Sequence, residues 1–374
     1  MISNTMRRNA HHRRLFVNCI VQLRCNFEPA EFFSSPQTTL PSIFILALLI
    51  ALGYLMDLKL IIFYSLIFQF YVQSLEWDYD GIHTGPANWS RIASPLCAGK
   101  QQSPIQIWPN DMKIALVPRD LTPFDFHNLD NLITDAVIEN NGHSVSIPAK
   151  FNITVKGGPL EYEYQLRQFH FHWAAVNDLG SEHTIGSSHY PLEAHFVHTC
   201  EVPINGSSSF ASRIAVLAVF FELVSDPSVP QTTPLSSLAS YIKQCTFKND
   251  RHILKEDFEI QNFYPADPNS YMFYKGSLTT PPCTEDVSWV LFTHPMPVTI
   301  DELNSFRELH ANRRREGEKW LQRNFRPTQP LYGRQVLFVQ QDLHSYKKSN
   351  DATTCDKLLN FNQDSFQKIL SSHF

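Results

Sequence analysis

The stretch YQLRQFHFHW, residues 164–173, decides the fold of this chain. Its aromatic residues at alternate positions predict a β-strand. Because side chains alternate between the two faces of a strand, Gln168, His170 and His172 share one face. The intervening aromatic residues take the other face, where they can form an apolar core. His170 and His172 are then separated by about 6.5–7 Å at their Cα atoms, which suits two ligands of one ion.

A His-x-His pair is a weak signal by itself, because two histidines on a strand can also be ordinary packed side chains. A second strand-like stretch, EAHFVH at residues 193–198, supplies a third candidate ligand. Here Glu193, His195 and Val197 share one face. An antiparallel neighbour would place His195 opposite the first pair, and Glu193 could orient an imidazole through its second N–H. Three neutral histidines leave one tetrahedral zinc position for water, as in catalytic sites.

The composition favours a single β-rich globular domain. The 374 residues carry a formal net charge of −5, so no basic footprint predicts nucleic-acid binding. From about residue 76 to 343, β-branched and aromatic runs alternate with Pro, Gly and Asn. Two stretches, residues 233–244 and 299–311, have the spacing of short helices, with N-caps at Thr233 and Thr299. We expect one mainly β (α+β) domain over residues 76–343.

Residues 1–75 differ from the rest of the chain, because arginines precede two apolar runs at residues 42–56 and 60–72. Residues 56–74 alone have the pattern of a signal peptide. Alternatively the two runs form an uncleaved signal anchor, although Asp57 near mid-membrane would cost about 2.5–3.5 kcal/mol. A buried core helix is a third interpretation. The first two predict a domain that is secreted or held at the extracellular face of a membrane.

Other features agree with the secretory path. Three glycosylation sequons occur, at Asn88, Asn152 and Asn205. The seven cysteines include no CxxC pair, which argues against a thiolate zinc ribbon. Residues 344–374 form a polar tail without the apolar end that a lipid-anchor signal needs.

Short motifs in a fixed order resemble those of the α-class carbonic anhydrases. They are WDYDGIHTGPANW, QQSPIQI, ENNGHSVSI, QFHFHW, GSEHT, EAHFVH, GSLTTPP, VSW and NFRPTQPL, over about residues 77–339. The WDYD opening lacks the usual Gly after Trp, and PPCTEDVSW varies in its middle, but neither departure touches a catalytic position. The resemblance implies the α-carbonic anhydrase fold, a large twisted, mostly antiparallel central sheet with short peripheral helices.

The resemblance also implies an activity: reversible hydration of CO2 to bicarbonate and a proton, by attack of a zinc-bound hydroxide and proton shuttling through a histidine. The implied cofactor is Zn²⁺, and its ligands are His170, His172 and His195. Gln168 and Glu193 are the implied hydrogen-bond acceptors of His170 and His195. The main-chain carbonyl near Asn324 is the implied acceptor of His172.

Further site residues follow from the same resemblance. Thr279 is the implied gatekeeper, which accepts a hydrogen bond from the reacting hydroxide and donates one to Glu182. Thr280 lines the substrate position. The apolar wall that receives CO2 comprises Val197, Ile214, Val216, Leu278, Val287 and Trp289.

The implied proton shuttle is His143, because an unperturbed imidazole titrates near pKa 6.5. Tyr79, Asn141 and Ser146 match positions that organise water between the metal and the shuttle. Family members often have Asn where this chain has Ser146, so the resemblance does not define the path of the water molecules here.

Cys97 and Cys283 stand where extracellular family members form a disulfide. Cys200 and Cys245 could form a second bridge, and Cys355 in the tail is left over.

Three functions compete. An active carbonic anhydrase needs the three histidines and the partners named above. An inactive extracellular binding module of the same fold typically lacks one or more zinc histidines, all of which this chain keeps. Another zinc hydrolase would need a motif such as HExxH, which is absent. The expected partner is the small-molecule substrate CO2 or bicarbonate, with membrane association possible through the N-terminal apolar segment. The oligomeric state cannot be predicted from the sequence.

Overall fold

The computed structural model describes residues 76–108, 112–114, 122–204, 209–224, 233–255 and 257–339. The predicted N-terminal signal segment, the polar tail from residue 344, and Asn205 lie outside these residues. Within the described residues, no helix is long and apolar enough to cross a membrane.

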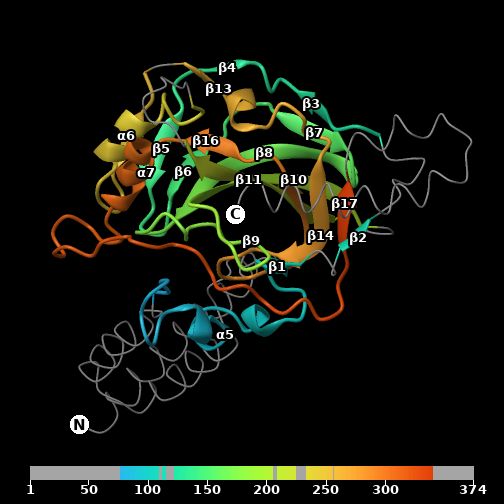
Figure 1. The fold of residues 1–374 in the computed structure, drawn as a ribbon, viewed down its shortest axis with the longest axis horizontal. Helices are drawn as coiled ribbons and strands as arrows, with labels where there is room; N and C mark the ends of the chain where they lie inside the picture. Colours follow the sequence, from blue (N-terminus) through green and yellow to red (C-terminus); the bar gives the residue numbers. More distant parts are fainter. Residues whose placement is uncertain are drawn as a thin grey trace, which may run out of the picture. The chain divides into compact units, whose positions relative to one another are not determined.

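One sheet of 13 strands dominates the domain (Figure 1). Its main path runs β12 (Arg251–Ile253), β5 (Val137–Asn140), β6 (Val145–Pro148), β8 (Leu160–Trp173), β10 (Leu192–Pro203), β11 (Phe210–Leu223), β15 (Glu285–Phe292), β14 (Tyr271–Ser277), β17 (Val336–Val339) and β2 (Met112–Ile114). Off this path lie β3 (Asp125–His127), β7 (Thr154–Gly157) and β16 (Met296–Val298). Only the pairings of β11 with β15 and β16, and of β17 with β2, are parallel in this sheet.

The remaining elements are short and lie outside this sheet. Two-stranded sheets are formed by β1 (Gln106–Ile107) with β9 (Thr184–Ile185) and by β4 (Leu132–Ile133) with β13 (Phe258–Glu259). The α-helices are α5 (Trp89–Ile92), α6 (Ala239–Gln244) and α7 (Ile300–Arg307), and the 3₁₀ helices are η1 (Pro86–Asn88), η2 (Pro95–Ala98) and η4 (Ile260–Phe263). The predicted architecture, a mostly antiparallel central sheet with short helices, is confirmed.

The central strand β8 separates two environments. Phe169, Phe171 and Trp173 are fully buried in the larger hydrophobic core, on the face expected from strand alternation. His170 and His172 lie on the opposite face. The pairing of β8 with β10 is antiparallel and places His195 directly opposite His170. The register therefore brings the two histidine stretches together.

The two predicted helices differ in how far they form. Thr299 begins α7 with a capping box, because its side chain accepts from the Glu302 N–H while the Glu302 carboxylate accepts from the Thr299 N–H. The other helix, α6, is shorter than predicted, beginning at Ala239 with Leu238 as its N-cap. Thr233 does not cap it, because its hydroxyl donates to the buried Glu302 carboxylate instead. A tertiary contact thus replaces the predicted cap.

A disulfide joins Cys97 in η2 to Cys283, across a sequence separation of 186. Both residues are buried with Tyr79 and Trp89 in a small separate cluster. Cys200 and Cys245 are both free thiols, so the possible second bridge does not form. Cys355 lies outside the described residues.

We predict that the double variant Cys97→Ser, Cys283→Ser lowers the free energy of unfolding by about 2–5 kcal/mol, because a long loop is no longer closed in the unfolded chain. Urea denaturation of the oxidised protein measures this. Replacing the free thiol in Cys200→Ser should cost about 1 kcal/mol or less. Equal losses in both proteins would contradict the assignment of stability to the disulfide.

Candidate metal centre

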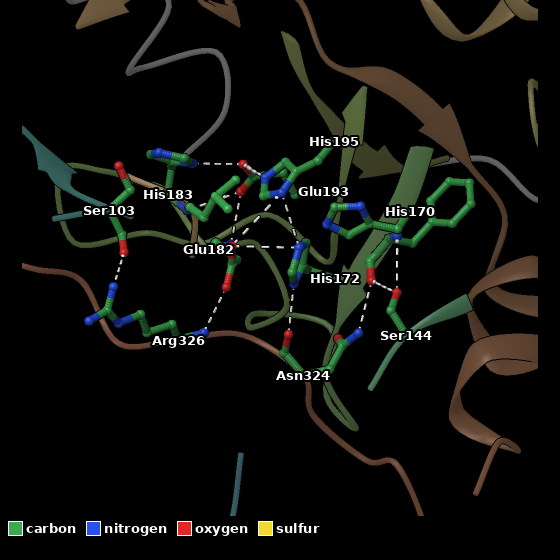
Figure 2. A network of polar contacts seen from close by, with 12 residues as sticks. Ser103, Ser144, His170, His172, Glu182, His183, Glu193, His195, Asn324 and Arg326 are labelled. Carbon is green, nitrogen blue, oxygen red and sulfur yellow. Dashed lines mark hydrogen bonds and ion pairs between the residues drawn. The ribbon is translucent and has the colours of Figure 1, made fainter. Parts of the chain in front are cut away.

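Three imidazoles converge on the inner face of β8 and β10 (Figure 2). His170, His172 and His195 each offer one ring nitrogen, and these nitrogens lie within 4.8 Å of one another. His172 is fully buried and His195 is 1% exposed. The structure therefore brings together the three predicted ligands, two from one strand and one from its neighbour.

The second nitrogen of each ring is held by an acceptor. His170 Nδ1 lies 2.9 Å from the Gln168 side-chain oxygen, and His172 Nδ1 lies 2.7 Å from the Asn324 main-chain oxygen. His195 Nε2 lies 2.7 Å from Glu193 Oε1. Amide, carbonyl and carboxylate oxygens accept, so each of these nitrogens carries the proton. The lone pairs therefore sit on His170 Nε2, His172 Nε2 and His195 Nδ1.

The contact between two of these lone-pair nitrogens tests whether a metal fits. His172 Nε2 lies 3.1 Å from His195 Nδ1, and neither atom has a proton to share. Two acceptors at this separation repel each other unless a cation lies between them. Tetrahedral ligation with Zn–N bonds of about 2.0–2.1 Å gives an N–N separation of about 3.3 Å. The nitrogen set and its spacing fit zinc.

Burial keeps the three rings neutral. It lowers the pKa of His170 to about 3, with His195 adding repulsion. It also lowers the pKa of His172 well below its ordinary value. Burial lowers the pKa of His195 as well, although Glu193 opposes the shift. All three imidazoles can therefore offer lone pairs at neutral pH.

Glu193 fixes the tautomer of His195 through a longer chain of hydrogen bonds. Its Oε1 accepts from His195 and from His183 Nδ1, each at 2.7 Å. His183 Nε2 then accepts from the Tyr274 hydroxyl at 2.7 Å, and Tyr274 in turn contacts Ser103 Oγ at 2.7 Å. Because the Glu193 carboxylate can only accept hydrogen bonds, His183 Nδ1 donates to it. This sets the direction of the hydrogen bonds that follow, from Tyr274 to His183 and from Ser103 to Tyr274.

The charge on Glu193 is stabilised by its surroundings. Burial alone would raise its pKa, but the interactions with His183 and His195, including a hydrogen bond from each ring, hold the pKa well below its usual range. Its Oε2 also accepts from the main-chain N–H groups of Glu182 and His183. The second candidate metal group, His183 with Glu193 and His195, is thus already joined internally by hydrogen bonds.

Glu182 lies beside the imidazoles, and only one of its carboxylate oxygens accepts a hydrogen bond from the described residues. Oε1 accepts from the Arg326 N–H at 2.8 Å. Oε2 is buried 3.5 Å from His172 Nε2 and has no hydrogen-bond partner among the described residues. Burial raises the pKa of Glu182 well above its usual value, whereas the Arg326 N–H and the buried Thr279 hydroxyl favour the carboxylate. Thr279 is thus close enough to act on Glu182, although the contact falls short of hydrogen-bond geometry.

An apolar wall adjoins the imidazoles. Neighbouring strands place Val197 opposite Val216 and Val216 opposite Trp289. The Trp289 ring lies 4.9 Å from the His195 ring, centroid to centroid. All six predicted apolar residues belong to, or pack against, one hydrophobic cluster, namely Val197, Ile214, Val216, Leu278, Val287 and Trp289. Thr280 is partly exposed, next to Thr279.

His143 is held in a tight turn and covered by an aromatic ring. Asn141 Oδ1 accepts from the N–H groups of His143 and Ser144, both at 2.8 Å. The His143 ring stacks on Trp77, with centroids 3.8 Å apart and planes 14° apart. Burial lowers the pKa of His143 to about 4, and the charge of Lys248 adds to the shift. In this stacked conformation, burial thus favours the neutral form of the His143 imidazole, and its role as the shuttle stays a prediction.

The other residues expected to organise water occupy different surroundings. Tyr79 is 4% exposed, and burial followed by the charge of Glu182 raises its pKa well above the usual value. Ser146 pairs with His170 across the sheet, and its hydroxyl donates to Glu139. Their role in a water path stays a prediction.

Asn324 joins several parts of the site. Its carbonyl accepts from His172, and its side-chain Nδ2 donates to the carbonyls of His143 and Phe171 at 3.0 and 2.8 Å. Its Oδ1 accepts from the Trp173 N–H at 2.7 Å.

Sequence reasoning missed three residues of this site: His183, Tyr274 and Trp77. His183 stands next to Glu182 in the GSEHT motif, and Trp77 begins the WDYDGIHTGPANW motif. Both residues could therefore have been identified from the family motifs. Tyr274 reaches His183 only through the fold, and nothing in its own stretch indicates the contact.

Comparisons with known proteins agree with this geometry. The sequence model of the eukaryotic-type carbonic anhydrases matches residues 84–340. Human carbonic anhydrase 7 is 34% identical over 272 residues, which cover 70% of this chain and 96% of that protein. Carbonic anhydrase 1 of Monodelphis domestica is 34% identical over 271 residues, covering 70% and 97%. Putative carbonic anhydrase 5 of Caenorhabditis elegans is 32% identical over 272 residues, covering 70% and 81%. The chain therefore belongs to the family of eukaryotic-type carbonic anhydrases.

Proposed function

We propose that this protein is an active zinc enzyme that interconverts CO2 and bicarbonate. The observation that carries the proposal is the convergence of three imidazole rings, in which His172 Nε2 lies 3.1 Å from His195 Nδ1 while the other nitrogen of each ring faces an acceptor. His170, His172 and His195 would hold the ion. Bound Zn²⁺ would supply an acidified water molecule, whose pKa in carbonic anhydrases, the standard example of this effect, is about 7 rather than about 15.7.

Thr279 and Glu182 would orient the reacting water. The open Oε2 of Glu182 can only accept while the carboxylate is charged, so it would take the proton of the Thr279 hydroxyl in a hydrogen bond. The Thr279 oxygen is then left as an acceptor for the reacting water. This arrangement selects one orientation of the water lone pair toward the carbon of CO2.

The apolar wall would bind CO2 by excluding water from the space beside the metal ligands. Val197, Val216 and Trp289 lie side by side on three neighbouring strands. CO2 is apolar and uncharged, so it loses little hydration free energy when it binds to such a surface. Bicarbonate is charged and would lose much more. The wall therefore favours binding of CO2 and release of bicarbonate.

His143 would carry the proton to solvent. Stacked on Trp77, with a pKa of about 4, its ring is a weak proton acceptor at neutral pH. We therefore infer that transfer involves a conformation in which the ring leaves Trp77 and regains its ordinary pKa. The Asn141 turn holds the backbone at this position while the side chain moves.

We also propose that the domain works in an oxidising compartment, secreted or at the extracellular face of a membrane. The Cys97–Cys283 disulfide supports this location, since disulfides persist mainly there. Asn152, in one of the three sequons, is exposed and available for a glycan.

Removing one ligand tests the metal assignment. We expect His170→Ala to lower zinc affinity by more than about 100-fold and to abolish CO2 hydration, whereas Gln168→Ala, which removes only the partner of that ring, should lower affinity by about 10–100-fold. Zinc content by mass spectrometry and stopped-flow hydration rates measure both effects. Stoichiometric zinc in wild-type protein without hydration would instead favour the inactive binding module.

The role of Thr279 predicts a loss of rate without a loss of metal. Thr279→Ala should lower kcat/KM by about 10²–10³-fold, because an oriented hydrogen bond at the reacting water is removed. Zinc content should not change, and Thr279→Ser should recover most of the rate. A serine variant as slow as the alanine variant would argue against the hydroxyl as the active group.

The stacking of His143 predicts a pKa change. Trp77→Ala should raise the pKa of His143 from about 4 toward about 6.5, because the imidazole becomes hydrated and its charged form is no longer penalised. The ring protons of His143 report the titration by NMR, with His143→Ala as the assignment control. Trp108→Ala, at an exposed tryptophan, should leave the pKa unchanged. An unchanged pKa in Trp77→Ala would contradict the burial argument.

A further inference from the structure

A pocket that the proposed mechanism does not use lies near the turn that carries His143, because one of its lining residues, Lys248, packs against Gly142. It has a volume of about 400 Å³ and is lined by residues 248–250 and 313–316. Four of the lining residues are basic and two are acidic, and Glu76, outside the lining, pairs with Lys248, which leaves a surplus of one positive charge. The chain as a whole has a net charge of −5, so this local excess is opposite in sign to the rest of the molecule.

The two acidic lining residues do not neutralise all of the basic groups. Asp250 forms an ion pair with Arg314 at 3.3 Å, and the Arg314 guanidinium also lies over the Phe247 ring. Glu316 accepts a hydrogen bond from the main-chain N–H of Arg313, not from its guanidinium. Among the described residues, neither Arg313 nor Arg315 forms an ion pair within 4.0 Å. Two guanidinium groups are thus available to an incoming anion.

The pocket is joined to the shuttle through Lys248. The Lys248 side chain covers Gly142, since a Cβ on that glycine would lie 2.6 Å from Lys248 Cδ. Gly142 directly precedes His143 in the turn. The Lys248 ammonium pairs with Glu76, next to Trp77 on which His143 stacks. The charged groups that act on His143 are Lys248, Lys319, Glu76 and Asp78.

We propose that this pocket binds a small protonatable oxyanion, of which monohydrogen phosphate is the type, and that this anion takes the proton from His143. The inference rests on the proposed function and extends it to the identity of the proton acceptor. Planar guanidinium groups donate paired hydrogen bonds to oxyanions, so Arg313 and Arg315 would hold the anion. A phosphodiester such as a lipid headgroup has no site that is protonated near neutral pH, so a free anion suits this role.

The transfer balances without any further reactant. The N–H bond of the His143 imidazolium breaks, and an O–H bond forms on the anion, which becomes dihydrogen phosphate. His143 returns to its neutral form, and the singly charged product binds the guanidinium groups less tightly than the doubly charged anion. Loss of one charge therefore favours release of the protonated carrier.

Binding is tested directly with inorganic phosphate. Isothermal titration calorimetry of the zinc-loaded protein at constant ionic strength should give a one-site isotherm that the double variant Arg313→Gln, Arg315→Gln weakens by about tenfold or more. Lys150→Gln, at an exposed lysine outside the pocket, serves as the matched control and should bind phosphate like wild type. Equal affinity in all three proteins would overturn the site.

The acceptor role is tested by hydration kinetics at limiting buffer. We expect the ratio of turnover in phosphate to turnover in a neutral amine buffer to fall about tenfold in the double variant and to stay unchanged in Lys150→Gln. Sulfate, which binds as an oxyanion but takes no proton near neutral pH, should inhibit only the phosphate-dependent turnover. Loss of binding with an unchanged ratio would overturn the acceptor role. A protein inactive in every buffer would instead refute the proposed enzyme, while calorimetry still decides the pocket.

Discussion

The register between β8 and β10 is the constraint on which the rest of the site depends. It sets His195 opposite His170, and the alternation of faces brings His172 to the same side. A shift of β8 by one residue would turn His170 and His172 toward the aromatic core, away from His195, and would turn Phe169 and Phe171 toward the apolar wall. The core packing of Phe169 and Phe171 therefore enforces the ligand geometry.

Burial and hydrogen bonding act together on these rings. Burial disfavours protonated imidazoles, and an acceptor behind each ring decides which nitrogen keeps its proton. The acceptor for His195 is itself fixed, because Glu193 receives hydrogen bonds from His183 and from two main-chain N–H groups. Glu182 differs, since its Oε2 has no hydrogen-bond partner in the part of the chain that the structure describes. Two carboxylates that are neighbours in space thus have unlike surroundings.

Much of this arrangement could be predicted from the sequence where local periodicity decides the outcome. Strand alternation predicted the face shared by His170 and His172, and the capping box at Thr299 follows from a local motif. Prediction failed where a distant group intervened. Thr233 bonds to Glu302 instead of capping α6, and the His143 ring stacks on Trp77, in surroundings where burial lowers its pKa. Contacts between residues that are far apart in the sequence cannot be predicted from the local sequence pattern.

The hydrogen bonds of Asn324 restrict how far the turn that carries His143 can move. One residue fastens the ring of a ligand histidine, the turn that carries His143, and the end of β8. The backbone of the turn therefore cannot move relative to β8 without breaking hydrogen bonds of the Asn324 side-chain amide. If His143 carries the proton as we propose, its movement would therefore be confined to the imidazole side chain, because the backbone of its turn is anchored through Asn324.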